Sequence, residues 1–334
     1  METIIFGSTG LKVSRQGFGG IPIQRITYDE STAILRRAYE GGILLYDTAH
    51  GYTTSQDRIG KALGAFRKEL VFCTKAPVNS LEFIEDAINN SLKMLQTDYL
   101  DVFQFHNPPF VPEPGAEDGF YDLLLKLKKD GKVKHIGITQ HKYTLAKKAI
   151  ESKNYEVLQY PFSYLSSDKE LKLLELCVEQ NMGVLAMKGM AGGLLTNAKA
   201  AFAFLRQYKN LVPIWGIEKM SELEEFLSFE ESLPSISDAQ KDIERDQAEL
   251  SGSFCRGCGY CLPCPANIPI PMAARITFLL KRSVRESFIT QEWQENMRRV
   301  DDCVNCGHCS QHCPYELDTP TLLKKEQKEY FSMI

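Results

Sequence analysis

Eight of the ten cysteines of this chain fall between residues 255 and 313, in two runs of similar spacing. The first run reads CRGCGYCLPCP and the second CVNCGHCSQHCP. Each run supplies three cysteines at steps of three, and then a fourth cysteine that is followed by proline. In bacterial ferredoxins three such thiolates bind one iron–sulfur core, while the fourth ligates the other cluster. We therefore predict two [4Fe–4S] clusters with crossed ligation.

Crossed ligation divides the eight cysteines into two sets of four. One cluster would be held by Cys255, Cys258, Cys261 and Cys313, and the other by Cys303, Cys306, Cys309 and Cys264. The first run departs from the usual spacing, because two residues rather than three precede its last cysteine. A pair of zinc sites is the alternative, but zinc prefers two separated CxxC pairs. The sequence leaves open whether the clusters transfer electrons or are purely structural.

A second group of polar residues stands where apolar runs end in the first half of the chain, namely Asp47, Tyr52, Lys75 and His106. A tyrosine is a weak acid with a pKa of about 10. A neighbouring lysine ammonium stabilises the phenolate and should lower that pKa. An aspartate can hold the lysine charged, and a histidine can orient a carbonyl or share the proton. These four residue types together predict proton transfer to a carbonyl oxygen.

The elements that would position these residues repeat along residues 1 to about 234. Short apolar runs predict strands near Val13–Phe18, Gly42–Tyr46, Leu70–Thr74, Leu100–Phe105, Val133–Ile138, Glu156–Gln159, Gly183–Met187 and Val212–Gly216. Segments with apolar residues three and four apart, typical of helices, lie between them. Eight strand–helix units favour a (β/α)₈ TIM barrel, whose strand ends deliver catalytic residues to one rim. An open doubly wound sheet is the alternative, but Gly17-Phe18-Gly19-Gly20 is too short for its glycine-rich turn.

The composition changes near residue 235. We expect an α/β barrel domain over residues 1–234, and over 235–334 a helical segment followed by a C-terminal ferredoxin-like iron–sulfur domain. The chain has 39 basic and 43 acidic residues, so the basic excess of a nucleic-acid-binding protein is missing. No apolar run approaches the roughly 18 residues of a membrane span. The N-terminus has no signal-peptide pattern, so we expect a cytoplasmic protein with reduced cysteines.

Residues 1–233 resemble the aldo/keto reductase family. The resemblance rests on YDTAHGY at 46–52, Lys75, YLDVFQFHNP at 99–108 and later segments such as VKHIGITQH, VLQYPFSY and GVLAMKGMAGGLL. It implies that an extended nicotinamide dinucleotide binds the barrel, that its hydride passes to a carbonyl carbon, and that Tyr52 protonates the oxygen. The whole chain resembles a branch of the family with a C-terminal ferredoxin-type 2[4Fe–4S] domain, found mostly in anaerobes.

The resemblance also implies cofactor contacts. Thr139, Gln140 and Gln159 match positions that hold the carboxamide, and Met187 stands where many members stack a ring on the nicotinamide. Met187 could equally be barrel core. Lys188, Gly189 and the loop 191–193 would border the pyrophosphate, and Glu225 matches an adenine contact. Members that prefer NADPH carry a basic residue or serine after the last strand, whereas this chain has Glu218 and Glu222. NADPH and NADH both stay open.

Two functional hypotheses follow. In the first, the chain is an oxidoreductase that reversibly reduces a small carbonyl compound with NADPH or NADH. In the second, it is an iron–sulfur electron-transfer protein whose barrel is a docking or sensing scaffold. Residues 235–334 carry 12 basic and 14 acidic side chains, and thiolate-bound clusters would make them more acidic. Such a surface could dock a basic redox partner. The sequence identifies neither the substrate nor the oligomeric state.

Overall fold

The computed structural model describes residues 1–250, 254–282 and 284–334. These residues form two compact units. The first contains residues Met1–Gly189 and Ala198–Gln240, and the second contains Met190–Asn197 and Lys241–Ile334. The predicted division after residue 234 stays a prediction, and it did not anticipate that residues 190–197 pack with the C-terminal unit. No helix in the described part of the chain is long and apolar enough to cross a membrane.

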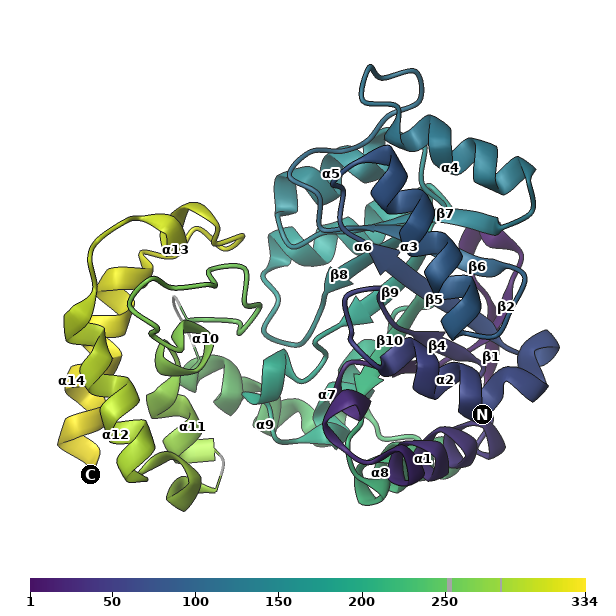
Figure 1. Ribbon diagram of the computed structural model, residues 1–334. Helices are drawn as coiled ribbons and strands as arrows, with labels where there is room; N and C mark the ends of the chain where they lie inside the picture. The colour runs from purple at the N-terminus through teal and green to yellow at the C-terminus, as the bar shows by residue number, and fades with distance from the viewer. Residues whose placement is uncertain (251–253, 283) are drawn as a thin grey trace. The chain divides into compact units, whose positions relative to one another are not determined.

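The first unit is a closed barrel of eight parallel strands, as the sequence predicts (Figure 1). The strand order around the barrel is β10-β3-β4-β5-β6-β7-β8-β9. Most strand residues are buried on both faces, which explains why these runs are apolar throughout rather than alternating. The strands are β3 (Gly17–Gly19), β4 (Leu45–Asp47), β5 (Val71–Ala76), β6 (Leu100–His106), β7 (Val133–Thr139), β8 (Val157–Pro161), β9 (Gly183–Met187) and β10 (Leu211–Gly216).

A short hairpin precedes the barrel. Its strands β1 (Thr3–Ile5) and β2 (Lys12–Ser14) pair antiparallel. The predicted strand Val13–Phe18 is therefore wrong as a single element, because it joins the end of β2 to the start of β3. Phe6 and Val13 of the hairpin pack against the apolar side chains inside the barrel, including Cys73. The hairpin thus contributes to the barrel core, to which the buried Cys73 also belongs.

Helices follow the strands and cover the outside of the barrel (Figure 1). They are α1 (Tyr28–Glu40), α2 (Ser55–Leu63), α3 (Leu81–Met94), α4 (Phe120–Lys129), α5 (Tyr143–Glu151), α6 (Asp168–Glu179), α7 (Ala198–Arg206) and α8 (Met220–Glu231). Local sequence determines several of their starts. Thr27 with Glu30 and Ser167 with Glu170 form capping boxes, in which each side chain accepts a hydrogen bond from the backbone of the other residue.

The second unit is helical. Its elements are α9 (Ile236–Glu249, whose first residues belong to the first unit), α10 (Ile270–Ala273), α11 (Ile276–Arg282), α12 (Gln291–Arg298), α13 (His308–Gln311) and α14 (Thr319–Met333). Its core contains Ile276 and Leu280 of α11, Met297 of α12 and Leu323 of α14, and several of the cysteines adjoin it. Ser235 precedes the first turn of α9, and its hydroxyl accepts a hydrogen bond from the Asp238 backbone amide at 3.1 Å.

Candidate active site and cysteine cavities

Adjacent barrel strands bring the predicted proton-transfer residues together. Asp47 ends β4, Lys75 is the penultimate residue of β5, and His106 ends β6. Tyr52 lies in the loop between β4 and α2. Because the strands are parallel and neighbouring in this order, their carboxyl ends meet at one rim. The ring centroids of Tyr52 and His106 are 6.1 Å apart in an edge-on arrangement, and the Lys75 ammonium lies 5.2 Å from the Tyr52 ring centroid.

Lys75 and Asp47 form a buried ion pair at the base of this group. The lysine Nζ donates to Asp47 Oδ2 at 2.5 Å and to the Thr48 carbonyl at 2.8 Å. Burial by itself would lower the pKa of Lys75, but the Asp47 carboxylate outweighs burial and leaves that pKa raised. The lysine therefore stays protonated at neutral pH and places a fixed positive charge beside Tyr52.

Tyr52 differs from expectation in the direction of its pKa. Burial raises the pKa of the phenol by more than the nearby Lys75 charge lowers it, and the net shift is upward. We expected a net decrease because the sequence shows the lysine but not how deeply the phenol is buried. At neutral pH Tyr52 is consequently protonated and can donate a proton. His106 is neutral, because burial and the Lys75 charge lower its pKa to about 3.

Gln104 is a member of the site that the sequence reasoning missed. Its Nε2 donates to Asp47 Oδ1 at 3.4 Å and to Gln159 Oε1 at 3.1 Å, and Gln159 Nε2 donates to Asp47 Oδ2 at 3.3 Å. The two amides therefore orient the carboxylate that holds Lys75. A signal was present in the sequence, since Gln104 interrupts an apolar strand two residues before His106. Residues two apart on a strand point to the same side.

The three residues expected to hold a carboxamide differ in their hydrogen-bond partners. Thr139 ends β7, and its Oγ1 accepts a hydrogen bond from the Asn107 backbone amide at 2.9 Å. Gln159 is hydrogen-bonded to both Asp47 and Gln104. Gln140 donates from Nε2 to the Pro108 carbonyl at 2.8 Å, while its buried Oε1 has no hydrogen-bond partner in the described chain. That oxygen is the acceptor a carboxamide N–H would need.

The remaining predicted cofactor contacts lie around β9 and α8. Met187 ends β9 and packs against the barrel interior, which fits the core reading considered above. Lys188 has a φ of 57°, so the chain turns sharply after the strand. Gly189 allows this turn to approach Trp215, because a Cβ there would lie 2.6 Å from the indole ring. Glu225 is exposed on α8.

The N-terminus of α8 is occupied by a carboxylate of the chain itself. Glu222 Oε2 accepts hydrogen bonds from the backbone amides of Glu218 and Lys219 at 2.8 and 3.0 Å. The Glu218 carboxylate pairs with Arg25 at 3.3 Å. A helix N-terminus favours anions, so this end could have bound a phosphate group. Here Glu222 takes that role.

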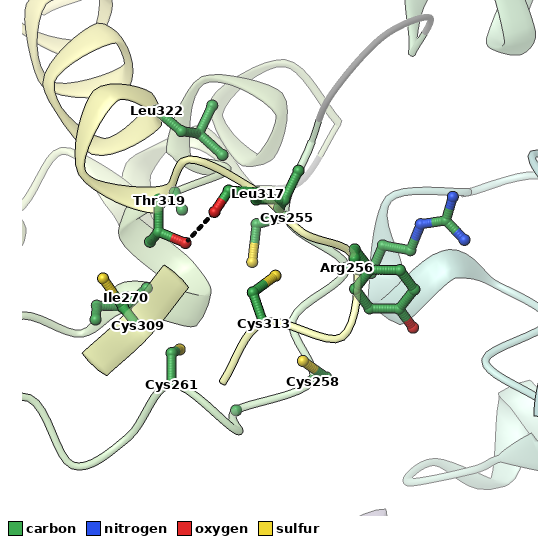
Figure 2. A pocket seen from close by; sticks show the side chains of 13 residues that line it. Cys255, Arg256, Cys258, Cys261, Ile270, Cys309, Cys313, Leu317, Thr319 and Leu322 are labelled. Carbon is green, nitrogen blue, oxygen red and sulfur yellow. Dashed lines mark hydrogen bonds between the residues drawn. The ribbon is translucent and has the colours of Figure 1, made fainter. Parts of the chain in front are cut away.

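In the second unit, one predicted cysteine quartet lines a cavity. Cys255, Cys258, Cys261 and Cys313 line it together with Cys309 and apolar side chains (Figure 2). Burial, followed by neighbouring thiols, raises the pKa of Cys261 to about 12. Because a metal ligand must be a thiolate, a bound metal core would have to displace that proton.

The other quartet lines a neighbouring cavity. Its cysteines are Cys264, Cys303, Cys306 and Cys309, with Cys261 at the border between the two cavities. Each cavity is thus lined by three cysteines of one run and by two of the other run, including its last cysteine, and Cys261 and Cys309 line both cavities. The thiols surround a space rather than a point, and no three Cys, His, Asp or Glu side chains in the described ranges are placed to hold one metal ion. This geometry fits a multi-atom core.

Comparison with known proteins decides the family of the barrel. The model of the aldo/keto reductase family matches residues 3–203, which is more than half of the chain. The chain belongs to the aldo/keto reductase family. Within this aldo/keto reductase, residues 254–318 match the model of a 4Fe-4S dicluster domain, so iron–sulfur clusters are part of the protein.

Individual relatives of this aldo/keto reductase are distant. It is 31% identical over 215 residues to L-galactose dehydrogenase from Arabidopsis thaliana, covering 59% of this chain and 67% of that protein. It is 28% identical over 229 residues to the NADH-specific methylglyoxal reductase of Escherichia coli strain K12, covering 59% and 69% of the two chains. The structure of the aldo-keto reductase AKR11C1 from Bacillus halodurans, in its holo form, matches with a TM-score of 0.64 at 21% identity over 74% of this chain and 96% of that chain. That similarity establishes the fold, and the relatives identify this aldo/keto reductase as an oxidoreductase.

Proposed function

We propose that this oxidoreductase reversibly reduces a small aldehyde or ketone to an alcohol with a nicotinamide dinucleotide, and that Tyr52 is the general acid. The observation that carries the proposal is the buried Asp47–Lys75 ion pair beside Tyr52. A buried phenol with a raised pKa holds its proton until a substrate oxygen gains negative charge. The fixed ammonium of Lys75 then stabilises the phenolate that remains.

His106 completes the arrangement. It is neutral because its pKa is lowered to about 3, so its ring carries one N–H donor and one acceptor nitrogen. We propose that the N–H orients the carbonyl oxygen toward Tyr52. In the oxidation direction the Tyr52 phenolate would accept the proton of the alcohol. Gln104 and Gln159 keep Asp47 oriented throughout.

The nicotinamide dinucleotide supplies the hydride when it is bound, and the Gln140 Oε1 without a partner supports its placement at the barrel rim. Thr139, Met187, Lys188, Gly189 and Glu225 are the further proposed contacts. We propose that NADH is preferred over NADPH, because the Glu222 carboxylate occupies the helix end that would otherwise attract a 2′-phosphate. Glu218 adds a second carboxylate nearby.

We propose further that the C-terminal unit holds two [4Fe–4S] clusters with crossed ligands. Cys255, Cys258, Cys261 and Cys313 would hold cluster A, and Cys264, Cys303, Cys306 and Cys309 would hold cluster B. The two cavities support this division, because each is lined by one of these sets. Such clusters fit a reducing cytoplasm and an acidic surface that receives electrons from a basic redox partner.

The test is the Tyr52→Phe variant, assayed anaerobically with a panel of small aldehydes and ketones and with NADH or NADPH. Loss of a general acid should lower kcat by about 10²- to 10⁴-fold. Tyr46→Phe is the matched control, since its buried hydroxyl has no hydrogen-bond partner among the described residues and lies outside the proposed machinery. Iron and sulfide content must be equal in both variants. Unchanged turnover in Tyr52→Phe would refute the proposal.

A further inference from the structure

The C-terminal unit contains an arginine that is buried without a carboxylate partner. Arg275 is only 7% exposed. Its Nη1 donates to the Gly192 carbonyl at 2.7 Å and its Nη2 lies 3.5 Å from the Met272 sulfur, while its buried Nε has no hydrogen-bond partner among the residues that the structure describes. Within the described ranges it forms no ion pair. An uncompensated buried charge costs several kcal/mol, so a negative charge is expected next to it in the assembled protein.

The guanidinium of Arg275 is seated between two glycines that both have positive φ. A Cβ on Gly257 would lie 2.9 Å from the guanidinium carbon, and a Cβ on Gly192 would lie 3.0 Å from Nη1. Gly257 belongs to the first cysteine run, and its backbone amide donates to Cys255 Sγ at 3.4 Å. The cation therefore lies against the loop that carries two proposed ligands of cluster A, Cys255 and Cys258.

A charge at this place acts unequally on the two oxidation states of a cluster. A [4Fe–4S] core with four thiolates is negative overall, and reduction adds one electron without breaking a bond. A nearby cation in a low-dielectric surrounding stabilises the reduced state more than the oxidised state. The hydrogen bond from Gly257 to the Cys255 sulfur acts in the same direction, because hydrogen bonds to cluster sulfurs are among the factors that set the potential.

The two cavities differ in the positively charged side chains near them. Arg256 lines the cavity of cluster A, where its guanidinium carbon lies 4.7 Å from the Tyr315 ring centroid. Among the described residues that line the cavity of cluster B there is no arginine or lysine. Cys306 of cluster B is exposed, whereas Arg275 is almost completely shielded from solvent. Screening by salt and water is therefore weak for the cation beside cluster A.

We infer that Arg275 raises the reduction potential of cluster A and leaves that of cluster B unaffected. The inference rests on the proposed crossed ligation, which supplies the negative charge that Arg275 lacks in its own surroundings. Arg275 acts only through its charge, which changes the reduction potential of cluster A, and it contacts no substrate.

The test is a potentiometric titration of the anaerobically purified full chain with dithionite, followed by electron paramagnetic resonance. In Arg275→Gln, one of the two reduction steps should move to a lower potential by at least about 59 mV. For a one-electron step this equals a tenfold change in the ratio of oxidised to reduced cluster at a given potential. The other step should stay in place. Arg275→Lys keeps the charge and should retain most of the wild-type potential.

Arg282→Gln is the matched control. Arg282 also donates to a carbonyl of the segment 190–197, at Leu194, but Asp246 and Glu249 neutralise its charge. The variant changes the net charge by the same amount as Arg275→Gln, and both steps should keep their potentials. An unchanged titration in Arg275→Gln with both clusters loaded would overturn the inference. A wild-type chain without two four-iron clusters would instead refute the proposed ligation.

Arg275→Gln could fail to load cluster A, and a second pair of variants covers that result. Met272 lies beside the guanidinium and is half-buried. Met272→Glu would place a carboxylate against Arg275 and cancel its charge, so the same step should move to lower potential. Met272→Gln adds the same bulk without charge and should leave it in place. Equal potentials in these two variants would overturn the inference.

Discussion

The Nζ of Lys75 lies 2.5 Å from Oδ2 of Asp47, and the two side chains are only 1% and 3% exposed. A charged pair removed from water in this way costs desolvation energy that its own attraction only partly returns. We propose that the pair serves to place a positive charge beside Tyr52 rather than to stabilise the fold. This relationship makes the stability of the barrel sensitive to the loss of one partner.

Lys75→Met should destabilise the protein by about 3 to 5 kcal/mol, because Asp47 is left as a lone buried carboxylate. The double variant Asp47→Asn with Lys75→Met removes both charges and should recover part of that loss. Denaturant unfolding measures both values. Arg37→Met is the control: it breaks the exposed Arg37–Glu224 pair and should cost less than about 1 kcal/mol. A Lys75→Met loss as small as this control would contradict the reasoning.

His106 predicts a pH dependence of stability. Its pKa falls from 6.5 to about 3 on folding, so between these values the unfolded chain binds a proton that the folded chain does not. The free energy of unfolding should therefore fall as the pH falls below about 6.5, by up to about 1.4 kcal/mol per pH unit from this residue. Urea titrations of wild type and His106→Gln compare the two slopes. Parallel curves would show that His106 is protonated in the folded protein.

Cofactor preference should respond to Glu222. Glu222→Gln removes the carboxylate from the N-terminus of α8, which should tighten NADPH binding several-fold relative to NADH, equivalent to about 1 kcal/mol. Some stability should be lost with the weaker cap. Calorimetric or fluorescence titration gives both dissociation constants. Glu231→Gln removes a carboxylate from the far end of the same helix and should not change the ratio. An equal effect of both variants would indicate a general charge effect.

Crossed ligation predicts which double cysteine variants behave like single ones. Cys264→Ala should lose cluster B and keep about four irons, and adding Cys303→Ala should change little because both ligate the same cluster. Cys264→Ala with Cys313→Ala should lose both clusters. Cys177→Ala is the control for a buried cysteine on α6 outside the cavities. Cys264→Ala with Cys303→Ala is the discriminating variant, and loss of both clusters in it would show that each run holds its own cluster.

Much of this architecture could be predicted because it depends on the periodicity of apolar residues and on the spacing of the cysteines. The apolar runs that end in Asp47, Lys75 and His106 indicate strands whose ends meet at one rim, and the cysteine steps indicate cluster ligands. The first barrel strand was misplaced in part, because Val13–Phe18 was expected to be one strand although Val13 belongs to β2 and Phe18 to β3. A local pattern cannot show where one strand ends and the next begins when both are buried.

The features that were missed depend on contacts between residues far apart in the chain. Gln104 on β6 donates a hydrogen bond to Asp47 on β4, and β5 lies between these two strands. The depth of burial that raises the pKa of Tyr52 is a property of the closed barrel. From the sequence, Arg275 looks like an ordinary helix residue. Only the structure shows that it donates a hydrogen bond to the carbonyl of Gly192, 83 positions earlier. Such pairings have no short-range signature in the sequence.

The chain crosses between its two compact units three times, after residues 189, 197 and 240. Gly192, Leu194 and Asn197 therefore have their hydrogen-bond partners, Arg275, Arg282 and Asp242, in a part of the sequence that a single cut after residue 240 would remove. The cluster domain is thus interleaved with the barrel rather than appended to it. A recombination that exchanges only the C-terminal third between relatives would import a domain whose matching loop stays behind in the donor.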